Sequence, residues 1–324
     1  VVALWALWYT AEYTTGITGF TVSEKQNIRL AINPVPHSAL IFIAQEKGYF
    51  EEQGLDVTFY EFQTGKLALD ALLAGGADIA TAADVPITLA ALANQPISVV
   101  ATVEYSDDDI QVVARKDASI QLPADLKGKT IATQQGGAPL FYTHKFLQQY
   151  GILLSEVRLI YLNPRDMVPA LLKKEIDAFV IFEPYPYFAQ RDIGEEKILL
   201  FHPENFYDET WNIVVMKQYE KNQQETIIHF LRALTKANTF LQQNVEESLQ
   251  IVSQYSETEP EIVAEIMKKQ IYGVVLSDRL LRYMNEEAIW AMEQKFTTVT
   301  DIPDLNSFIN PVYVQQLNPT ELTI

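Results

Sequence analysis

The stretch from Leu67 to Leu89, LALDALLAGGADIATAADVPITL, combines a helical pattern, a buried strand and the start of a second helix. Gly75-Gly76 ends the first helix, because glycine reaches left-handed conformations without a side-chain clash. The apolar run that follows is typical of a strand buried in a parallel sheet. Asp84, two residues before Pro86, is suited to begin the next helix. Asp84 is therefore predicted at the carboxyl end of a strand, where open α/β sheets bind ligands.

The same order of strand and helix recurs along the chain. A first set of β-α units is predicted from Ile28 to Ile110, and a second set follows as far as Glu183. This order predicts a mostly parallel sheet with helices on both faces. Asn212 begins the apolar run NIVVM, which we interpret as a return crossing from the second unit to the first.

Helical patterns dominate the last third of the chain. One long amphipathic helix is predicted over residues 225–254, and a second from Pro260 to about Gly273. A third is predicted to begin with Asn285 as its cap.

Composition limits the kinds of partner and chemistry. The 324 residues are 48% hydrophobic and carry a formal net charge of −18, which suits a two-domain globular protein and disfavours nucleic acid or an anionic membrane as a partner. The absence of cysteine excludes disulfides, thiolate catalysis and cysteine-based zinc sites.

The first residues, VVALWALWY, form an apolar run that is too short to span a bilayer, which needs about 20 residues. We interpret residues 1–27 as the remnant of a signal peptide or membrane anchor followed by a linker; the alternative is an ordinary N-terminal strand or the remnant of a tag. An extracytoplasmic location is expected, and the sequence leaves open whether this segment is cleaved or serves as an anchor.

The search for catalytic motifs is negative. The sequence contains none of the patterns G-x-x-x-x-G-K-[ST], G-x-G-x-x-G, H-E-x-x-H or G-x-S-x-G. Its four histidines are scattered, with no pair at metal-binding spacing. We therefore predict no catalytic residue, no metal site and no cofactor.

Helix starts that follow strands are the recurrent feature. They occur after Asn33, at Thr64, at Asp84 and at Gly136-Gly137, and each offers unpaired N–H groups and partial positive charge to an anion. Each is also explained by ordinary capping. Only convergence on one cleft, which the sequence does not display, would favour a binding site.

Acidic and aromatic residues favour a different ligand. Glu183 stands among aromatic rings in FEPYPYF, Trp211 precedes the return crossing, and His37 is close to prolines on a loop that ends a strand. Asp84 is either used in capping its helix or faces a cationic or hydrogen-bond-donating ligand. Aromatic side chains at such edges can wall a flat ligand, or they can simply fill the domain interface.

Four segments stand out as possible signatures: QEKGYFEEQGLDV at 45–57, LLAGGADIA at 72–80, DLKGKTIA at 125–132 and IDAFVIFEP at 176–184. Together they resemble one known family, the solute-binding proteins for nitrate, sulfonates, taurine and thiamine-precursor pyrimidines. In that family the first signature is similar to A-x-E-K-G-[FY]-F-x-x-x-G-L-D-V. The resemblance extends over about residues 28–311 in the same order.

The resemblance implies a type II periplasmic-binding-protein fold, in which two α/β lobes are joined by two hinge crossings. Residues 28–110 and 212–324 would form lobe 1, and residues 111–211 lobe 2. A small ligand would bind in the cleft and draw the lobes together, and an ABC permease in the membrane would recognise the closed form; a monomer is expected. The implied ligand-binding residues are Asn33, His37, Thr64, Asp84, Gly136, Gly137, Ala138, Glu183 and Trp211.

Ligand identity stays open. Sulfonate binders commonly place serine or threonine after the glycine at the start of the helix in the second lobe, and Ala138 stands there instead. Overall resemblance favours a sulfonate, nitrate or taurine-like anion. The alternatives are a thiamine-precursor pyrimidine or another flat, donor-bearing ligand, a ligand-sensing module, and an enzyme on the same fold similar to one of the menaquinone pathway.

Overall fold

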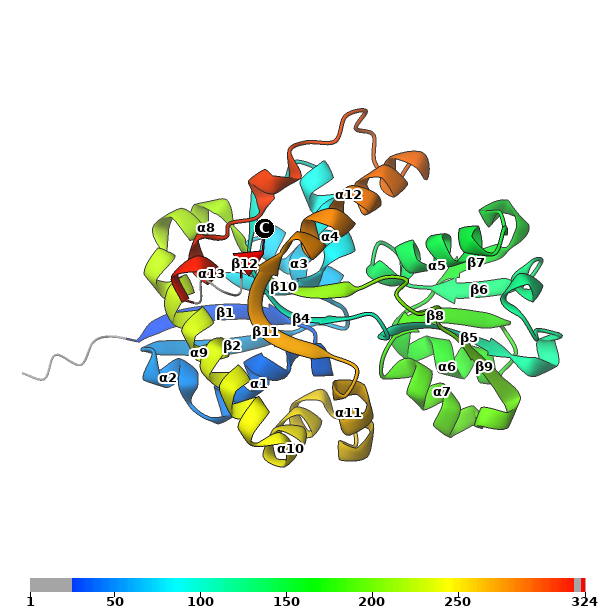
Figure 1. Ribbon diagram of the computed structural model, residues 1–324, viewed down its shortest axis with the longest axis horizontal. Helices are drawn as coiled ribbons and strands as arrows, with labels where there is room; N and C mark the ends of the chain where they lie inside the picture. Colours follow the sequence, from blue (N-terminus) through cyan, green and yellow to red (C-terminus); the bar gives the residue numbers. More distant parts are fainter. Residues whose placement is uncertain (1–24, 318–321, 324) are drawn as a thin grey trace, which may run out of the picture.

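The protein consists of two α/β lobes of unequal size, which lie side by side in the computed structural model (Figure 1). The structure describes residues 25–317 and 322–323. Most of the segment 1–27, interpreted above as a signal or anchor remnant, lies outside the described residues. Among those described, no helix combines the length and apolar character needed to cross a membrane.

The larger lobe is built on a seven-stranded sheet. In spatial order its strands are β12 (Leu322–Thr323), β11 (Ile271–Ser277), β4 (Ile97–Ser106), β10 (Glu209–Met216), β3 (Ile79–Ala83), β1 (Gln26–Ile32) and β2 (Leu55–Glu61). Its helices are α1 (Ala39–Glu46), α2 (Tyr49–Glu52), α3 (Gly65–Leu73), α4 (Asp84–Leu92), α8 (Lys217–Asn222), α9 (Gln224–Gln243), α10 (Val245–Ser256), α11 (Pro260–Met267), α12 (Asp278–Glu293) and α13 (Val312–Leu317), with short 3-10 turns η1 (Pro36–Ser38) and η6 (Leu305–Phe308).

The smaller lobe is built on a five-stranded sheet from one continuous segment. Its order is β7 (Arg158–Tyr161), β6 (Thr130–Thr133), β8 (Ala178–Phe182), β5 (Ile110–Arg115) and β9 (Ile198–Phe201). It carries α5 (Ala138–Gln149), α6 (Pro164–Leu172) and α7 (Tyr185–Ile193), with 3-10 turns η2 (Lys116–Ala118), η3 (Pro123–Leu126), η4 (Leu154–Glu156) and η5 (Glu195–Lys197).

Two short segments, residues 107–109 and 202–208, join the lobes. They leave the larger sheet side by side, because Ser106 at the end of β4 pairs with Glu209 at the start of β10. The sequence placed residues 209–211 in the second lobe, and the structure corrects this: they pair with β4 and β3 in the larger sheet. The apolar pattern began only at Asn212 because the side chains of Glu209 and Thr210 are polar although buried.

Both sheets are mixed, and this differs from the mostly parallel sheets that the repeat predicted. β1, β2 and β3 are parallel neighbours, as are β6, β7 and β8. The strands next to the crossings run the other way, since β10 is antiparallel to β3 and β4, and β5 to β8 and β9. A crossing strand enters its sheet from the other lobe, so it need not share the direction that β-α-β units impose.

Three helical predictions also need correction. The predicted helix 225–254 is two helices, α9 and α10, separated at Asn244. The segment near Gly273 forms strand β11 against β4. Asn285 lies inside α12, where its amide donates to the Leu281 carbonyl oxygen at 2.7 Å, so it does not cap the helix.

Candidate ligand-binding cavity

A small cavity lies between the lobes, with a volume of about 20 Å³, which is room for about one water molecule. The lobes are therefore in contact across it, and a larger solute would enter only as they separate. Its walls come from the ends of strands and the first turns of helices, as the repeat predicted for a ligand site. The lining residues are Asn33, Val35, His37, Gly65, Lys66, Ala83, Pro86, Glu209 and Trp211 from the larger lobe, and Gln134, Gly137, Ala138, Pro139 and Phe182 from the smaller.

Three helices begin at this cavity. Gly65 and Lys66 open α3, Ala83 precedes α4, and Gly137 and Ala138 open α5. The first N–H groups of a helix have no partner within it and carry partial positive charge, so the three starts together favour an acceptor or an anion. Thr64 caps α3 as predicted: its hydroxyl oxygen accepts from the Leu67 N–H at 3.2 Å, while its own side chain does not line the cavity.

Trp211 forms one wall. Its indole lies against the His37 ring, with centroids 5.3 Å apart, and its Nε1 donates to the Ser38 hydroxyl at 3.3 Å. The ring also lies directly over Gly65, where an added Cβ would be 2.6 Å from Trp211 Cη2. Gly65 is therefore needed so that the indole can close onto the start of α3.

Gly136 and Lys66 make a contact between the lobes. Gly136 has φ +68, and a Cβ at this position would lie 3.1 Å from Lys66 Cε. The Lys66 ammonium group meanwhile pairs with Asp70 at 2.6 Å, one turn further along α3. Because Lys66 lines the cavity, it is a cation beside the converging helix starts. A lysine in the first turn of a helix opposes the helix dipole, and this was the signal that sequence reasoning missed.

Asp84 is completely buried and does not line the cavity. Its carboxylate accepts from the Val85 N–H at 2.9 Å, from the Tyr207 hydroxyl, and from the N–H and hydroxyl of Thr210 at 3.2 and 3.3 Å. Burial raises the pKa of Asp84 to about 6, although these hydrogen bonds lower it. Asp84 thus serves both its own helix and the returning chain, a combination that neither sequence alternative included.

Glu183 is also buried outside the cavity wall. Its carboxylate accepts from the Tyr187 N–H at 3.2 Å at the start of α7, and its N–H donates to the Asp109 carbonyl oxygen at 3.2 Å. Lys269 of the larger lobe lies 3.8 Å from this carboxylate and 3.1 Å from Asp108. Burial raises the pKa of Glu183 to about 7, and Lys269 opposes the rise.

Five of the nine predicted residues line the cavity: Asn33, His37, Gly137, Ala138 and Trp211. Thr64, Asp84, Gly136 and Glu183 lie around it, as described above. Ligand contact by any of them stays a prediction.

Carboxylates that the sequence did not single out surround His37. His37 Nε2 lies 3.0 Å from Asp109 Oδ2, and both residues are at least 97% buried. Burial lowers the pKa of His37, but the charges of Asp109 and Glu104 outweigh it and raise the pKa to about 9. Burial raises the pKa of Glu104 to about 8. Burial and neighbouring acids also raise the pKa of Glu209 well above its ordinary value.

Several polar atoms of this region have no hydrogen-bond partner among the described residues. In the cavity wall they are Asn33 Oδ1, His37 Nδ1 and Glu209 Oε2, and deeper they include both carboxylate oxygens of Glu104. Buried polar groups are rarely left unpaired without a reason, and a bound ligand is one such reason.

The two sheets, the two crossings and the cavity between the lobes define the two-lobed fold of the periplasmic-binding-protein class. The chain belongs to the NMT1/THI5-like family, whose model matches residues 35–248.

Known proteins of similar sequence and structure agree with this class. A Bacillus subtilis protein, provisionally named as an aliphatic sulfonates-binding protein, is 24% identical over 307 residues, which is 91% of each chain. The alkanesulfonate-binding protein SsuA of Xanthomonas axonopodis pv. citri, solved with MOPS bound, superposes with a TM-score of 0.77 at 20% identity, covering 89% of this chain and 99% of that one. The periplasmic nitrate-binding protein NrtA of Synechocystis gives 0.73 at 13% identity, covering 92% and 89%.

These structures confirm the predicted fold. The desulfurization enzyme DSZB also shares it, with a TM-score of 0.65 at 12% identity and coverage of 91% and 100%, so the fold by itself does not separate binding proteins from enzymes.

Proposed function

We propose that this chain is the extracytoplasmic solute-binding component of an ABC importer, and that it captures a small organic or inorganic oxyanion of the sulfonate or nitrate type by closure of its lobes. The relatives carry names of sulfonate- and nitrate-binding proteins, one of them periplasmic. A membrane permease that recognises the closed form is the implied partner, and the protein would act as a monomer, delivered or anchored through its N-terminal segment.

The observation that supports an anionic ligand is the convergence of three helix starts and Lys66 on one cavity. The acidic side chain of Glu209 in the cavity wall is compatible with an anionic ligand. Because the pKa of its carboxyl is raised well above the ordinary value, this group keeps its proton at a pH where an exposed glutamate is ionised, and a protonated carboxyl donates a hydrogen bond.

Closure would be a shift between open and closed forms about the two crossings. An anion at the cavity would touch α3 and α4 of the larger lobe and α5 of the smaller at once, so it would stabilise the closed form by its differential contacts.

Calorimetry with a panel of anions tests the proposal. We expect binding of a short alkanesulfonate, taurine or nitrate, with a gain in compactness by small-angle scattering. Lys66→Met is expected to weaken binding by about 10- to 100-fold, the loss of one charge-assisted contact of about 1.5–3 kcal/mol. Lys221→Met, an exposed lysine on α8, is the matched control. Absence of binding and of any scattering change across the panel would refute the proposal.

One observation favours a second ligand class. Asn33 Oδ1 and Glu209 Oε2 are unpaired acceptors in the cavity wall, and they suit a flat, donor-bearing molecule such as an aminopyrimidine. Glu209→Gln separates the two candidates: it removes an acceptor that a donor-bearing ligand needs and preserves a donor for an anion.

A further inference from the structure

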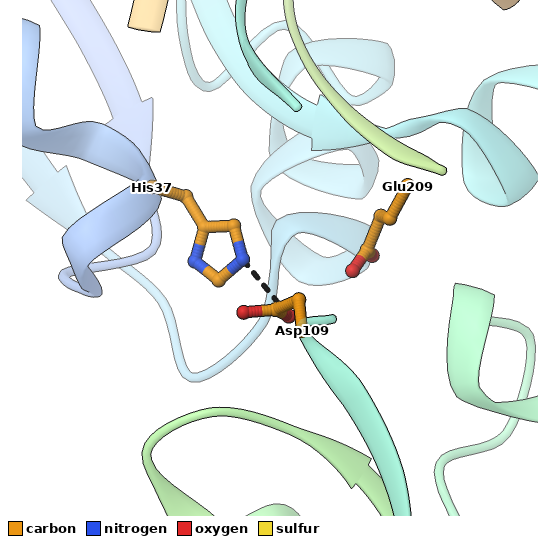
Figure 2. A group of neighbouring side chains, drawn as sticks. All are labelled: His37, Asp109 and Glu209. Atoms are coloured by element: carbon orange, nitrogen blue, oxygen red, sulfur yellow. Dashed lines mark ion pairs between the residues drawn. The ribbon is translucent and has the colours of Figure 1, made fainter. Parts of the chain in front are cut away.

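Three ligand-type side chains meet beside the cavity from three separate parts of the chain. His37 comes from η1 after β1, Asp109 from the first crossing, and Glu209 from the start of β10 (Figure 2). One ligand atom from each can be chosen so that all three lie within 4.8 Å of one another. Figure 2 shows the carboxylates of Asp109 and Glu209 turned toward the same space as the His37 ring.

The group is buried and rich in carboxyl groups. All three residues are at most 4% exposed, and Glu104, 1% exposed, lies close enough for its charge to act on His37 and Asp109. Apart from the His37–Asp109 ion pair, both Asp109 oxygens and Glu209 Oε2 have no partner among the described residues. Buried carboxylates at such density are costly unless a cation balances them.

We propose that His37, Asp109 and Glu209 form the binding site of one divalent transition-metal ion of the zinc type. Imidazole nitrogen and carboxylate oxygen are both zinc ligands, whereas calcium and magnesium favour oxygen ligands alone and in larger number. The ion replaces the proton that His37 would otherwise share with Asp109. Because His37 and Glu209 line the cavity, the ion lies at the cavity wall.

The site ties the first crossing to the larger lobe, at the point where the second crossing also ends. Asp109 belongs to the segment that leaves β4, Glu209 follows the segment that returns, and His37 follows β1 of the larger sheet. A cation held by all three therefore anchors the end of the first crossing to the larger lobe. The inference goes beyond the proposed function, since it needs no solute in the cavity.

No sequence pattern indicated this site, because the three residues are widely separated along the chain and form none of the short metal-binding spacings. Only the adjacent exits of β4 and β10 bring Asp109 and Glu209 together.

The test uses the full chain without a polyhistidine tag, stripped with a chelator and desalted. Zinc chloride is added, unbound metal is removed by gel filtration, and zinc per chain is measured by mass spectrometry, with titration calorimetry for affinity. We expect one zinc per chain in the wild-type protein. His37→Gln and Glu209→Gln should each lower the affinity at least tenfold, on the order of the loss seen when metal sites are perturbed. His229→Gln on α9 should leave it unchanged.

A second measurement guards against variants that do not fold. Cobalt(II) added to the wild-type protein should give visible absorption bands that zinc abolishes by competition, and circular dichroism establishes whether each variant is folded. The proposal is overturned if the wild-type protein retains no zinc and shows no cobalt bands, or if folded variants bind zinc as the wild-type protein does. Since no solute is present, a protein that holds zinc but binds no anion would refute only the proposed function, and the reverse result only the metal site.

Discussion

Protonation of His144 should loosen the contact between the lobes. This histidine is on α5 of the smaller lobe, 8% exposed, with its ring 5.5 Å from Trp290 and 6.0 Å from Phe296 of the larger lobe. Its Nε2 has no hydrogen-bond partner among the described residues. Burial lowers the pKa of His144 from 6.5 to about 4, because the charged ring would be held between aromatic side chains.

The direction of this pH effect follows from the difference between the pKa of His144 in the folded and in the unfolded state. A histidine whose folded pKa lies below its unfolded value favours the folded state fully above about pH 6.5, and this contribution is lost as the pH falls from 6.5 toward 4. At ~1.36 kcal/mol per unit, the whole difference is about 3 kcal/mol, of which at most about 2 kcal/mol is lost between pH 7 and pH 5. Opening of the lobes separates His144 from Trp290, so protonation favours the open form as well.

The assay is urea unfolding at pH 7 and pH 5 for the wild-type protein and His144→Leu, with small-angle scattering for the lobe arrangement. Buried carboxyls such as Asp84 also titrate in this range, so the informative quantity is the difference between the two proteins. We expect the wild-type protein to lose about 1–2 kcal/mol more than His144→Leu on acidification. Equal losses in the two proteins would refute the reasoning, and His229→Gln serves as the histidine control.

Three further predictions concern the cavity and its surroundings. Gly65→Ala places a Cβ 2.6 Å from Trp211 Cη2 and should lower the free energy of unfolding in urea by about 1–3 kcal/mol. Adding Trp211→Leu to this variant should restore part of the loss, and a double variant with no restoration would contradict a clash with the indole. The folded pKa of Asp84, about 6, lies above its ordinary 3.8, so its ionisation costs stability as the pH rises between these values. The free energy of unfolding of Asp84→Asn should therefore rise relative to that of the wild-type protein from pH 4 to pH 7. A difference between the two proteins that does not change with pH would argue against this. Lys269→Gln removes the partly exposed ion pairs with Asp108 and Glu183 and should shift the equilibrium toward the open form by no more than about 1 kcal/mol. Small-angle scattering should then show a slightly less compact protein, and a more compact one would contradict the prediction.

Local chemistry made the fold predictable. The hydroxyl of Thr64 caps α3 as its place before a helical pattern predicted, and the buried run after Gly76 is β3. Patterns that need a distant partner were less informative. The strand β11 is defined by pairing with β4, more than 160 residues earlier, and Asn285 resembles a cap although α12 continues through it.

The site was predictable only in outline for the same reason. Helix starts are visible in sequence, so Asn33, Gly137 and Ala138 were placed at the cavity. A buried acid such as Glu209 or Glu104 resembles a surface acid in sequence, because its burial comes from neighbours contributed by other segments. Asp84 shows the limit: its partners Tyr207 and Thr210 lie in the second crossing and at the start of β10, 123 and 126 residues later in the chain.

The place of β10 in the larger sheet has a consequence for how the chain folds. This strand lies between β3 and β4, so those two strands have no direct pairing and remain separate until residue 209 arrives. The smaller sheet comes from the continuous segment 110–201 and can assemble from contacts that are closer along the chain. During synthesis the inserted lobe can thus mature first, while the lobe that begins earlier is completed last. A lesion in β10 should therefore leave a folded smaller lobe attached to an unfinished larger one.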